Sequence, residues 1–171
     1  MTGKLRPSKG RRHRMAWRRR PKLSIRMTTH CRNQTADLLR ESAQLGTEGI
    51  VYFVGLTDGK ATVAMSAVLP EADTSPTSFD VSPKELSKII RSASLAGLQV
   101  VGQLHTHPKS AYHSEGDLLG MRIRHPGYFS IVVPDYGTRL PSLKHSHSLM
   151  WTDDGFKEIG RSIKFMDELR P

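Results

Sequence analysis

Residues 100–117 read VVGQLHTHPKSAYHSEGD, and the rest of the chain is organised around this stretch. The largely apolar run of residues 98–104 predicts a buried strand that delivers His105 and His107 at its C-terminal end. Because side chains alternate along an extended segment, we expect both imidazoles on the same face. Pro108 cannot donate a hydrogen bond to a sheet, so the strand should end there.

Ser114 and Asp117 follow a short loop, where a stretch with helical spacing begins. The pattern S-x-x-D is also typical of a helix start, in which the serine caps the first turn, and a capped helix would hold Asp117 rigidly. Two imidazoles and one carboxylate are the ligands of a catalytic zinc site with water in the fourth position, whereas structural sites more often use four ligands, commonly cysteines. An isolated H-x-H is usually incidental, but its combination with strand, proline, loop and S-x-x-D favours one zinc ion bound by His105, His107 and Asp117.

These two motifs, His105-Thr106-His107-Pro108 and Ser114-Glu115-Gly116-Asp117, resemble the signature of the JAMM metalloproteases, also called JAB or MPN-plus domains. The resemblance covers about residues 35–152. In its short, compact form the chain is similar to the prokaryotic JAB proteins. One departure is the loop of residues 108–113, which is one residue shorter than the commoner spacing. A surface loop can absorb such a deletion.

The resemblance implies a zinc-dependent isopeptidase or peptidase that hydrolyses the bond after the C-terminus of a ubiquitin-like protein or conjugate, through a zinc-activated water. It implies a ubiquitin-like or sulfur-carrier-like protein as the substrate, and E1- or E2-like enzymes as operon partners. The alternative is a catalytically silent MPN-type module that binds proteins. The intact set of His, His, Asp and Ser argues against that alternative.

Two catalytic residues follow from the same resemblance. A glutamate at the head of the first strand of the family would be the general base, which points to Glu48. Glu41 is the competing candidate, and Glu48 has the alternative interpretation of an ordinary exposed charge at a strand edge. Ser114 is expected to donate a hydrogen bond to the oxyanion of the tetrahedral intermediate.

The formal charge of +10 over 171 residues is concentrated at one end of the chain. Twelve of the 26 Lys and Arg residues lie between Lys4 and Arg32, where no acidic residue occurs, and the remainder carries 14 basic and 16 acidic residues. We interpret residues 1–32 as a disordered basic arm and residues 33–171 as the JAB/MPN domain. The arm is either a dispensable extension, with Met15 or Met27 as the true start, or an electrostatic contact for nucleic acid or an acidic partner.

The remaining pattern predicts an α/β fold, a mixed sheet sandwiched by helices in a single domain, which the resemblance identifies as JAB/MPN or cytidine-deaminase-like. Asp58-Gly59 predicts a hairpin between strands. Ser82-Pro83-Lys84-Glu85 predicts a helix start. Further helices are predicted at residues 35–45, 114–124 and 156–169, and further strands at residues 127–133 and 143–151.

Several residues have a less specific interpretation. Tyr112 and His113 are expected to fill the loop rather than contact substrate, and a second H-x-H, His145 and His147, is expected to be a surface strand pattern. The single cysteine, Cys31, excludes an intramolecular disulfide and is expected to be inert. No apolar run has the length of a membrane span and no secretory signal is evident, so we expect a cytoplasmic protein with no membrane partner.

Overall fold

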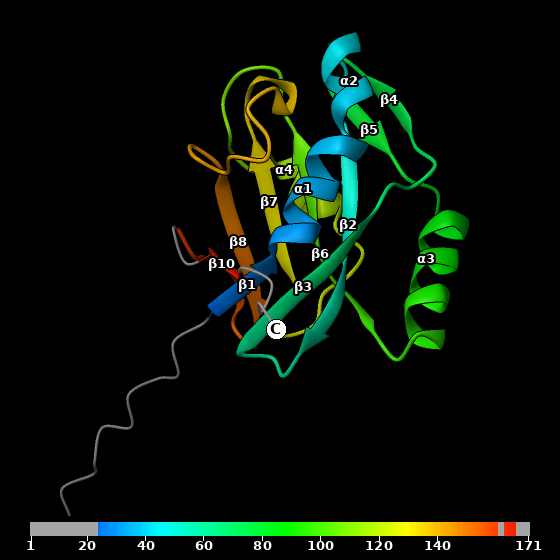
Figure 1. Ribbon diagram of the computed structural model, residues 1–171, viewed down its shortest axis with the longest axis vertical. Coiled ribbons are helices and arrows are strands. Elements are labelled where there is room, and N and C mark those ends of the chain that lie inside the picture. Colours follow the sequence, from blue (N-terminus) through cyan, green and yellow to red (C-terminus); the bar gives the residue numbers. More distant parts are fainter. Residues whose placement is uncertain (1–23, 161–162, 167–171) are drawn as a thin grey trace, which may run out of the picture.

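A mixed sheet in the order β10-β1-β3-β2-β6-β7-β8-β9 forms the centre of the protein (Figure 1). The structure, a computed structural model, describes residues 24–160 and 163–166. In chain order the strands of this sheet are β1 (Ser24–Thr28), β2 (Ile50–Thr57), β3 (Ala61–Val68), β6 (Gln99–Thr106), β7 (Phe129–Val133), β8 (His147–Thr152), β9 (Gly155–Glu158) and β10 (Ile163–Met166).

The other elements cover this sheet or border it. A small hairpin is made by two short strands, β4 (Asp73–Ser75) and β5 (Ser78–Asp80). The helices are α1 (Thr29–Leu38), α2 (Arg40–Leu45), α3 (Pro83–Leu95) and α4 (Glu115–Gly120), with a short 3-10 turn η1 (Asp135–Gly137).

Two apolar cores lie on the two faces of the sheet. One contains Cys31 and Leu39 from the α1–α2 region, packed on strand residues such as Phe53 and Phe129. The other joins the apolar stripe of α3 to strand residues such as Tyr52 and to Leu118 of α4. Helices therefore cover both faces, which confirms the predicted α/β fold class.

Most local predictions around the site are confirmed. Strands β2 and β3 pair antiparallel on either side of the Asp58-Gly59 turn. Ser82 caps α3, where its side chain accepts the Glu85 N–H. Strand β6 ends at Thr106, before Pro108 as expected, and β8 starts at His147 rather than at 143.

The boundary of the basic arm at residue 32 is wrong. Residues 24–28 form β1, an interior strand between β3 and β10, and α1 begins at Thr29. Ile25, Met27 and Cys31 are buried in the first core, so apolar burial outweighs the basic composition of this region. Residues 1–23 lie outside the described residues.

The predicted closing helix at residues 156–169 is also wrong where the structure describes it. Residues 155–158 form β9, which pairs antiparallel with β8, and residues 163–166 form β10, which pairs parallel with β1. Gly155 and Gly160 have positive φ angles of 96° and 50°, which are incompatible with a continuous helix. In the described part of the chain, no helix is long and apolar enough to cross a membrane.

Candidate metal centre

The two histidines lie at the end of an interior strand. In β6, His105 is paired with Ile50 of β2 on one side and with Val132 of β7 on the other. His107 follows the strand directly, and its N–H donates to the Val133 carbonyl oxygen at 2.9 Å. Both imidazoles are buried, with His105 at 0% and His107 at 7% exposure. The sheet therefore holds both rings rigidly.

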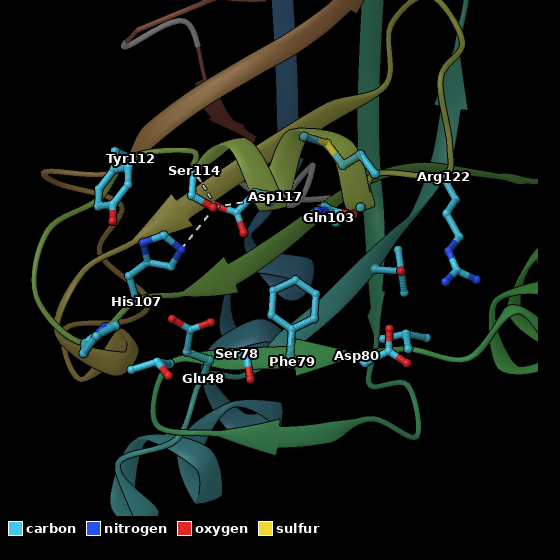
Figure 2. Close-up of a pocket in the computed structure, with 17 residues that line it drawn as sticks. Glu48, Ser78, Phe79, Asp80, Gln103, His107, Tyr112, Ser114, Asp117 and Arg122 are labelled. Carbon is cyan, nitrogen blue, oxygen red and sulfur yellow. Dashed lines mark hydrogen bonds and ion pairs between the residues drawn. The ribbon is translucent and has the colours of Figure 1, made fainter.

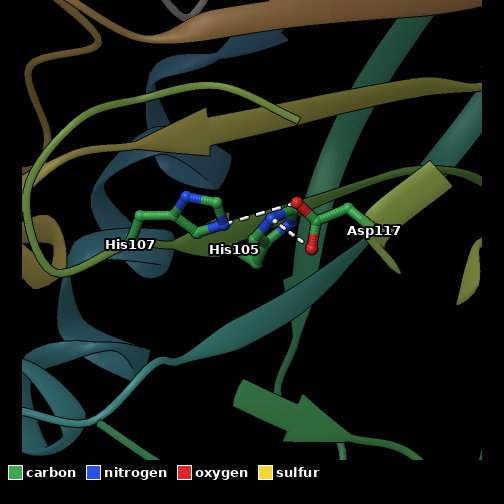
Figure 3. Close-up of side chains that lie close together, drawn as sticks. All are labelled: His105, His107 and Asp117. Carbon is green, nitrogen blue, oxygen red and sulfur yellow. Dashed lines mark ion pairs between the residues drawn. The ribbon is translucent and has the colours of Figure 1, made fainter. Parts of the chain in front are cut away.

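The start of α4 brings Asp117 to these rings. Ser114 Oγ accepts the Asp117 N–H at 3.1 Å, and Asp117 Oδ2 accepts the Ser114 N–H at 2.7 Å, which is the predicted capping box. The carboxylate then faces both imidazoles: Oδ1 lies 3.4 Å from His105 Nε2, and Oδ2 lies 3.4 Å from His107 Nε2 (Figure 3).

This cluster fits a divalent cation. One ligand atom from each of His105, His107 and Asp117 lies within 4.8 Å of the other two. Tetrahedral zinc with bonds of about 2.0–2.1 Å separates neighbouring ligand atoms by about 3.3 Å, and each imidazole Nε2 lies 3.4 Å from one oxygen of the Asp117 carboxylate. Both ring nitrogens of His105 are buried and have no hydrogen-bond partner among the residues described, an arrangement that a bound cation would relieve at one nitrogen.

The electrostatics favour the protonation states that a metal requires for two of the three residues. Burial lowers the pKa of His105, which keeps this imidazole neutral. Burial raises the pKa of Asp117, but the adjacent imidazoles of His105 and His107 outweigh it and hold the pKa well below its usual range. His107 differs, because the negative charges of Asp117 and Glu48 outweigh burial and raise its pKa. A metal ion would therefore compete with a proton for His107.

Glu48 lines a pocket of about 510 Å³ beside the ligand cluster. His107, Ser114 and Asp117 line the same pocket. Figure 2 shows the Glu48 carboxylate turned toward His107. Glu48 is 5% exposed, so it is not an ordinary exposed charge. Burial raises its pKa, the nearby His107 opposes this, and Asp117 adds to it.

Backbone pairing explains why Glu48 is held there. The Gly49 N–H donates to Thr106 Oγ1 at 2.8 Å, and the Thr106 N–H donates to the Gly49 carbonyl oxygen at 2.9 Å. The approach to α2 is close, since a Cβ added to Gly49 would lie 2.4 Å from Ser42 Oγ. The competing candidate, Glu41, is exposed on α2 and lines a different pocket.

The second H-x-H motif is split by the structure. His145 is exposed in the loop before β8 with a φ of 69°, whereas His147 is partly buried. His147 Nδ1 lies 2.7 Å from His113 Nδ1, and His113 Nε2 lies 2.8 Å from Ser130 Oγ. His147 is therefore a strand residue, as expected, but it is half-buried against His113 rather than fully on the surface. Burial, with the neighbouring histidines, lowers the pKa of His113 to about 3, so its ring is neutral.

Sequence reasoning missed Ser130 and His147 because their contact with His113 joins residues 17 and 34 positions apart. The spacing of His147 two residues after His145 was the only signal, and it gave no indication of the contact with His113. Tyr112 is exposed, lines the pocket and packs edge-on against His107 with ring centroids 5.2 Å apart.

Comparison with known proteins is consistent with this site. Over 117 residues the chain is 28% identical to the probable metalloprotease y4jG of Sinorhizobium fredii, and the alignment covers 66% of this chain and 72% of that protein. The solution structure of protein DSY2949 from Desulfitobacterium hafniense matches 85% of this chain and 94% of its own with a TM-score of 0.63 and 21% identity, which shows a shared fold. No protein-family model matches the sequence.

Proposed function

We propose that this protein is a zinc metallopeptidase of the JAMM type, which hydrolyses the bond after the C-terminus of a ubiquitin-like or sulfur-carrier-like protein. The observation that carries the proposal is the meeting of His105, His107 and Asp117 beside a pocket that also holds Glu48 and Ser114. The similarity to a protein named as a probable metalloprotease supports the coarser assignment, a metallopeptidase. The motif resemblance supports the finer one, with E1- or E2-like enzymes as operon partners.

Each residue has a task in this mechanism. Zinc held by His105, His107 and Asp117 would supply Lewis acidity and make water nucleophilic near neutral pH. Glu48 accepts the proton of the attacking water and passes it to the departing amine. Burial raises the pKa of Glu48, which makes this carboxylate a better proton acceptor than an exposed one.

Ser114 stabilises the negative charge that develops on the carbonyl oxygen of the substrate. Its Oγ already accepts the Asp117 N–H, which fixes the oxygen and leaves the hydroxyl hydrogen available for donation. Hydrogen-bond donors that are fixed before the reaction contribute most to such stabilisation.

The test uses the full chain loaded with zinc and a panel of ubiquitin-like and sulfur-carrier-like proteins extended beyond their C-termini. We expect cleavage after the last native residue of at least one substrate, loss of cleavage with a chelator, and recovery when zinc is restored. His107→Ala should lose both stoichiometric zinc and cleavage.

Two results would contradict the proposal in different ways. Stoichiometric zinc without cleavage of any substrate would favour the silent MPN-type binding module and leave the metal centre intact. Absence of zinc binding by the wild-type chain would contradict the proposed metal centre itself.

A further inference from the structure

The metal ligand His105 lacks the support that such a histidine usually has. In metal sites the ring nitrogen that does not bind the metal is held by a carboxylate, a carbonyl or water, which fixes the orientation of the ring. Nε2 of His105 faces Asp117, so Nδ1 is the nitrogen that should be supported. Nδ1 is buried and has no hydrogen-bond partner in the described part of the chain.

Packing orients this ring instead. Phe79 of β5 lies against it with ring centroids 5.1 Å apart, and His113 meets it edge-on at 5.8 Å and 86°. His113 is the partner that is itself fixed by polar contacts. Its Nδ1 is 2.7 Å from His147 Nδ1, and its Nε2 is 2.8 Å from Ser130 Oγ.

The anchors of His113 are mounted on the sheet. His105, Val132 and His147 are direct cross-strand neighbours on β6, β7 and β8, and Ser130 lies two residues before Val132. Residues at these positions project from the same face of the sheet as His105. Strand positions hold a side chain more precisely than the loop of residues 108–113 could.

We propose that His113, anchored by Ser130 and His147, is a positioning residue that orients the His105 imidazole in the metal centre. The edge-on contact of the His113 ring orients the His105 imidazole, as a hydrogen bond to Nδ1 does in other metal sites. His113 also directly precedes Ser114, the cap of α4, so the same anchors fix the backbone that leads to Asp117. The inference rests on the proposed metal centre and is independent of which bond is cleaved.

The test measures metal binding rather than cleavage. Zinc affinity is determined for the full chain by competition with a chromophoric chelator, and Co²⁺ is bound separately to record its visible absorption bands. We expect Ser130→Ala and His147→Phe to weaken zinc binding by about tenfold to a hundredfold and to shift the Co²⁺ bands. His147→Gln, whose amide can still donate or accept a hydrogen bond, should recover most of the affinity.

Two control variants separate positioning from general stability. Ser148→Ala removes a buried hydroxyl from the next residue of β8, which projects from the opposite face of the sheet. His125→Phe removes a ring whose Nε2 lies 3.1 Å from the Val100 carbonyl oxygen, at the other end of β6. Both should keep wild-type zinc affinity and Co²⁺ bands, whatever their effect on the melting temperature.

Three outcomes are decisive. The inference would be overturned if folded Ser130→Ala and His147→Phe kept wild-type zinc affinity and Co²⁺ bands. The contacts of His113 with Ser130 and His147 would then only anchor the loop of residues 108–113. Equal losses in His147→Gln and His147→Phe would also overturn the inference, because the effect would not depend on the hydrogen bond. Metal binding that responds to these variants without any cleavage would support the inference and contradict only the peptidase proposal.

Discussion

At the scale of single residues, a substitution of Glu48 can distinguish metal binding from hydrolysis. The Glu48 carboxylate is not one of the three clustered ligands, yet it lies in their pocket. We therefore expect Glu48→Gln to keep stoichiometric zinc and to lose about a hundredfold to ten-thousandfold of the hydrolysis rate. Cleavage assays with parallel metal analysis check this, with Glu41→Gln as the control. Normal turnover in Glu48→Gln would place the base elsewhere.

Cys31 provides a second prediction for a single residue. It is fully buried, and burial raises the pKa of its thiol to about 12, although a hydrogen bond with Thr35 acts in the opposite direction. Only the thiolate reacts readily with alkylating reagents. Iodoacetamide at pH 8 should leave the folded protein unmodified by mass spectrometry and should modify it in guanidinium chloride. Complete alkylation of the folded protein would show that Cys31 is accessible.

The sequence predicts individual site residues where a local pattern carries them. His105 and His107 were predictable because a short apolar run followed by proline indicates a strand end. Ser114 and Asp117 were predictable because S-x-x-D indicates a capped helix start. His147 could not be placed in this way, because its contact with His113 depends on the pairing of β7 with β8. Pairing between distant strands leaves no local signal of comparable strength.

At the scale of elements, the two serine caps distinguish the roles of Ser114. Ser82 caps α3 and Ser114 caps α4, each by accepting an N–H three residues later at 3.1 Å. Loss of such a cap typically costs about 0.5–2 kcal/mol. Ser82→Ala should therefore lower the free energy of unfolding by this amount and leave turnover unchanged.

Ser114→Ala should lower stability by a similar amount but also reduce turnover by about a hundredfold to a thousandfold, because it removes the proposed oxyanion donor. Zinc should be retained in both variants. Denaturation curves, metal analysis and rates measured together check the pair. Equal rates in Ser82→Ala and Ser114→Ala would assign Ser114 to helix capping alone.

Elements bounded by turn or capping residues are predictable from the sequence. Elements that depend on pairing with a distant strand are not. The β2–β3 hairpin follows from Asp58-Gly59, and α3 follows from Ser82-Pro83. The apolar spacing of Ile159, Ile163 and Met166 suits a helix equally well, but pairing with β8 and β1 selects strands there. The alternation of Ile25 and Met27, both buried, was a short strand signal hidden among basic residues.

At the scale of the whole molecule, the corrected boundary of the basic arm changes the truncation that can test it. We expect deletion of residues 1–23 to keep the melting temperature, because the described sheet begins at Ser24. Deletion of residues 1–32 should abolish cooperative unfolding, since it removes β1 from between β3 and β10 together with the buried Cys31. Circular dichroism melts of both truncations check this. A folded protein without residues 24–32 would contradict the role of β1.

The shorter truncation also tests the arm as a contact for nucleic acid. Ten Lys and Arg residues lie between Lys4 and Lys22, so binding through them should weaken steeply with salt and disappear in the chain that lacks residues 1–23. Fluorescence anisotropy with a labelled oligonucleotide at several salt concentrations measures this. Salt-dependent binding that persists in the truncated chain would place the contact on the folded domain.

The parallel pairing of β1 with β10 joins the first and the last of the described strands. During synthesis on a ribosome, β1 emerges before β10, and its outer edge stays open until residues 163–166 have left the exit tunnel. An open edge of this kind recruits other chains. The newborn protein should therefore depend on chaperones until β10 has been synthesised, and it should aggregate when translation stops before β10.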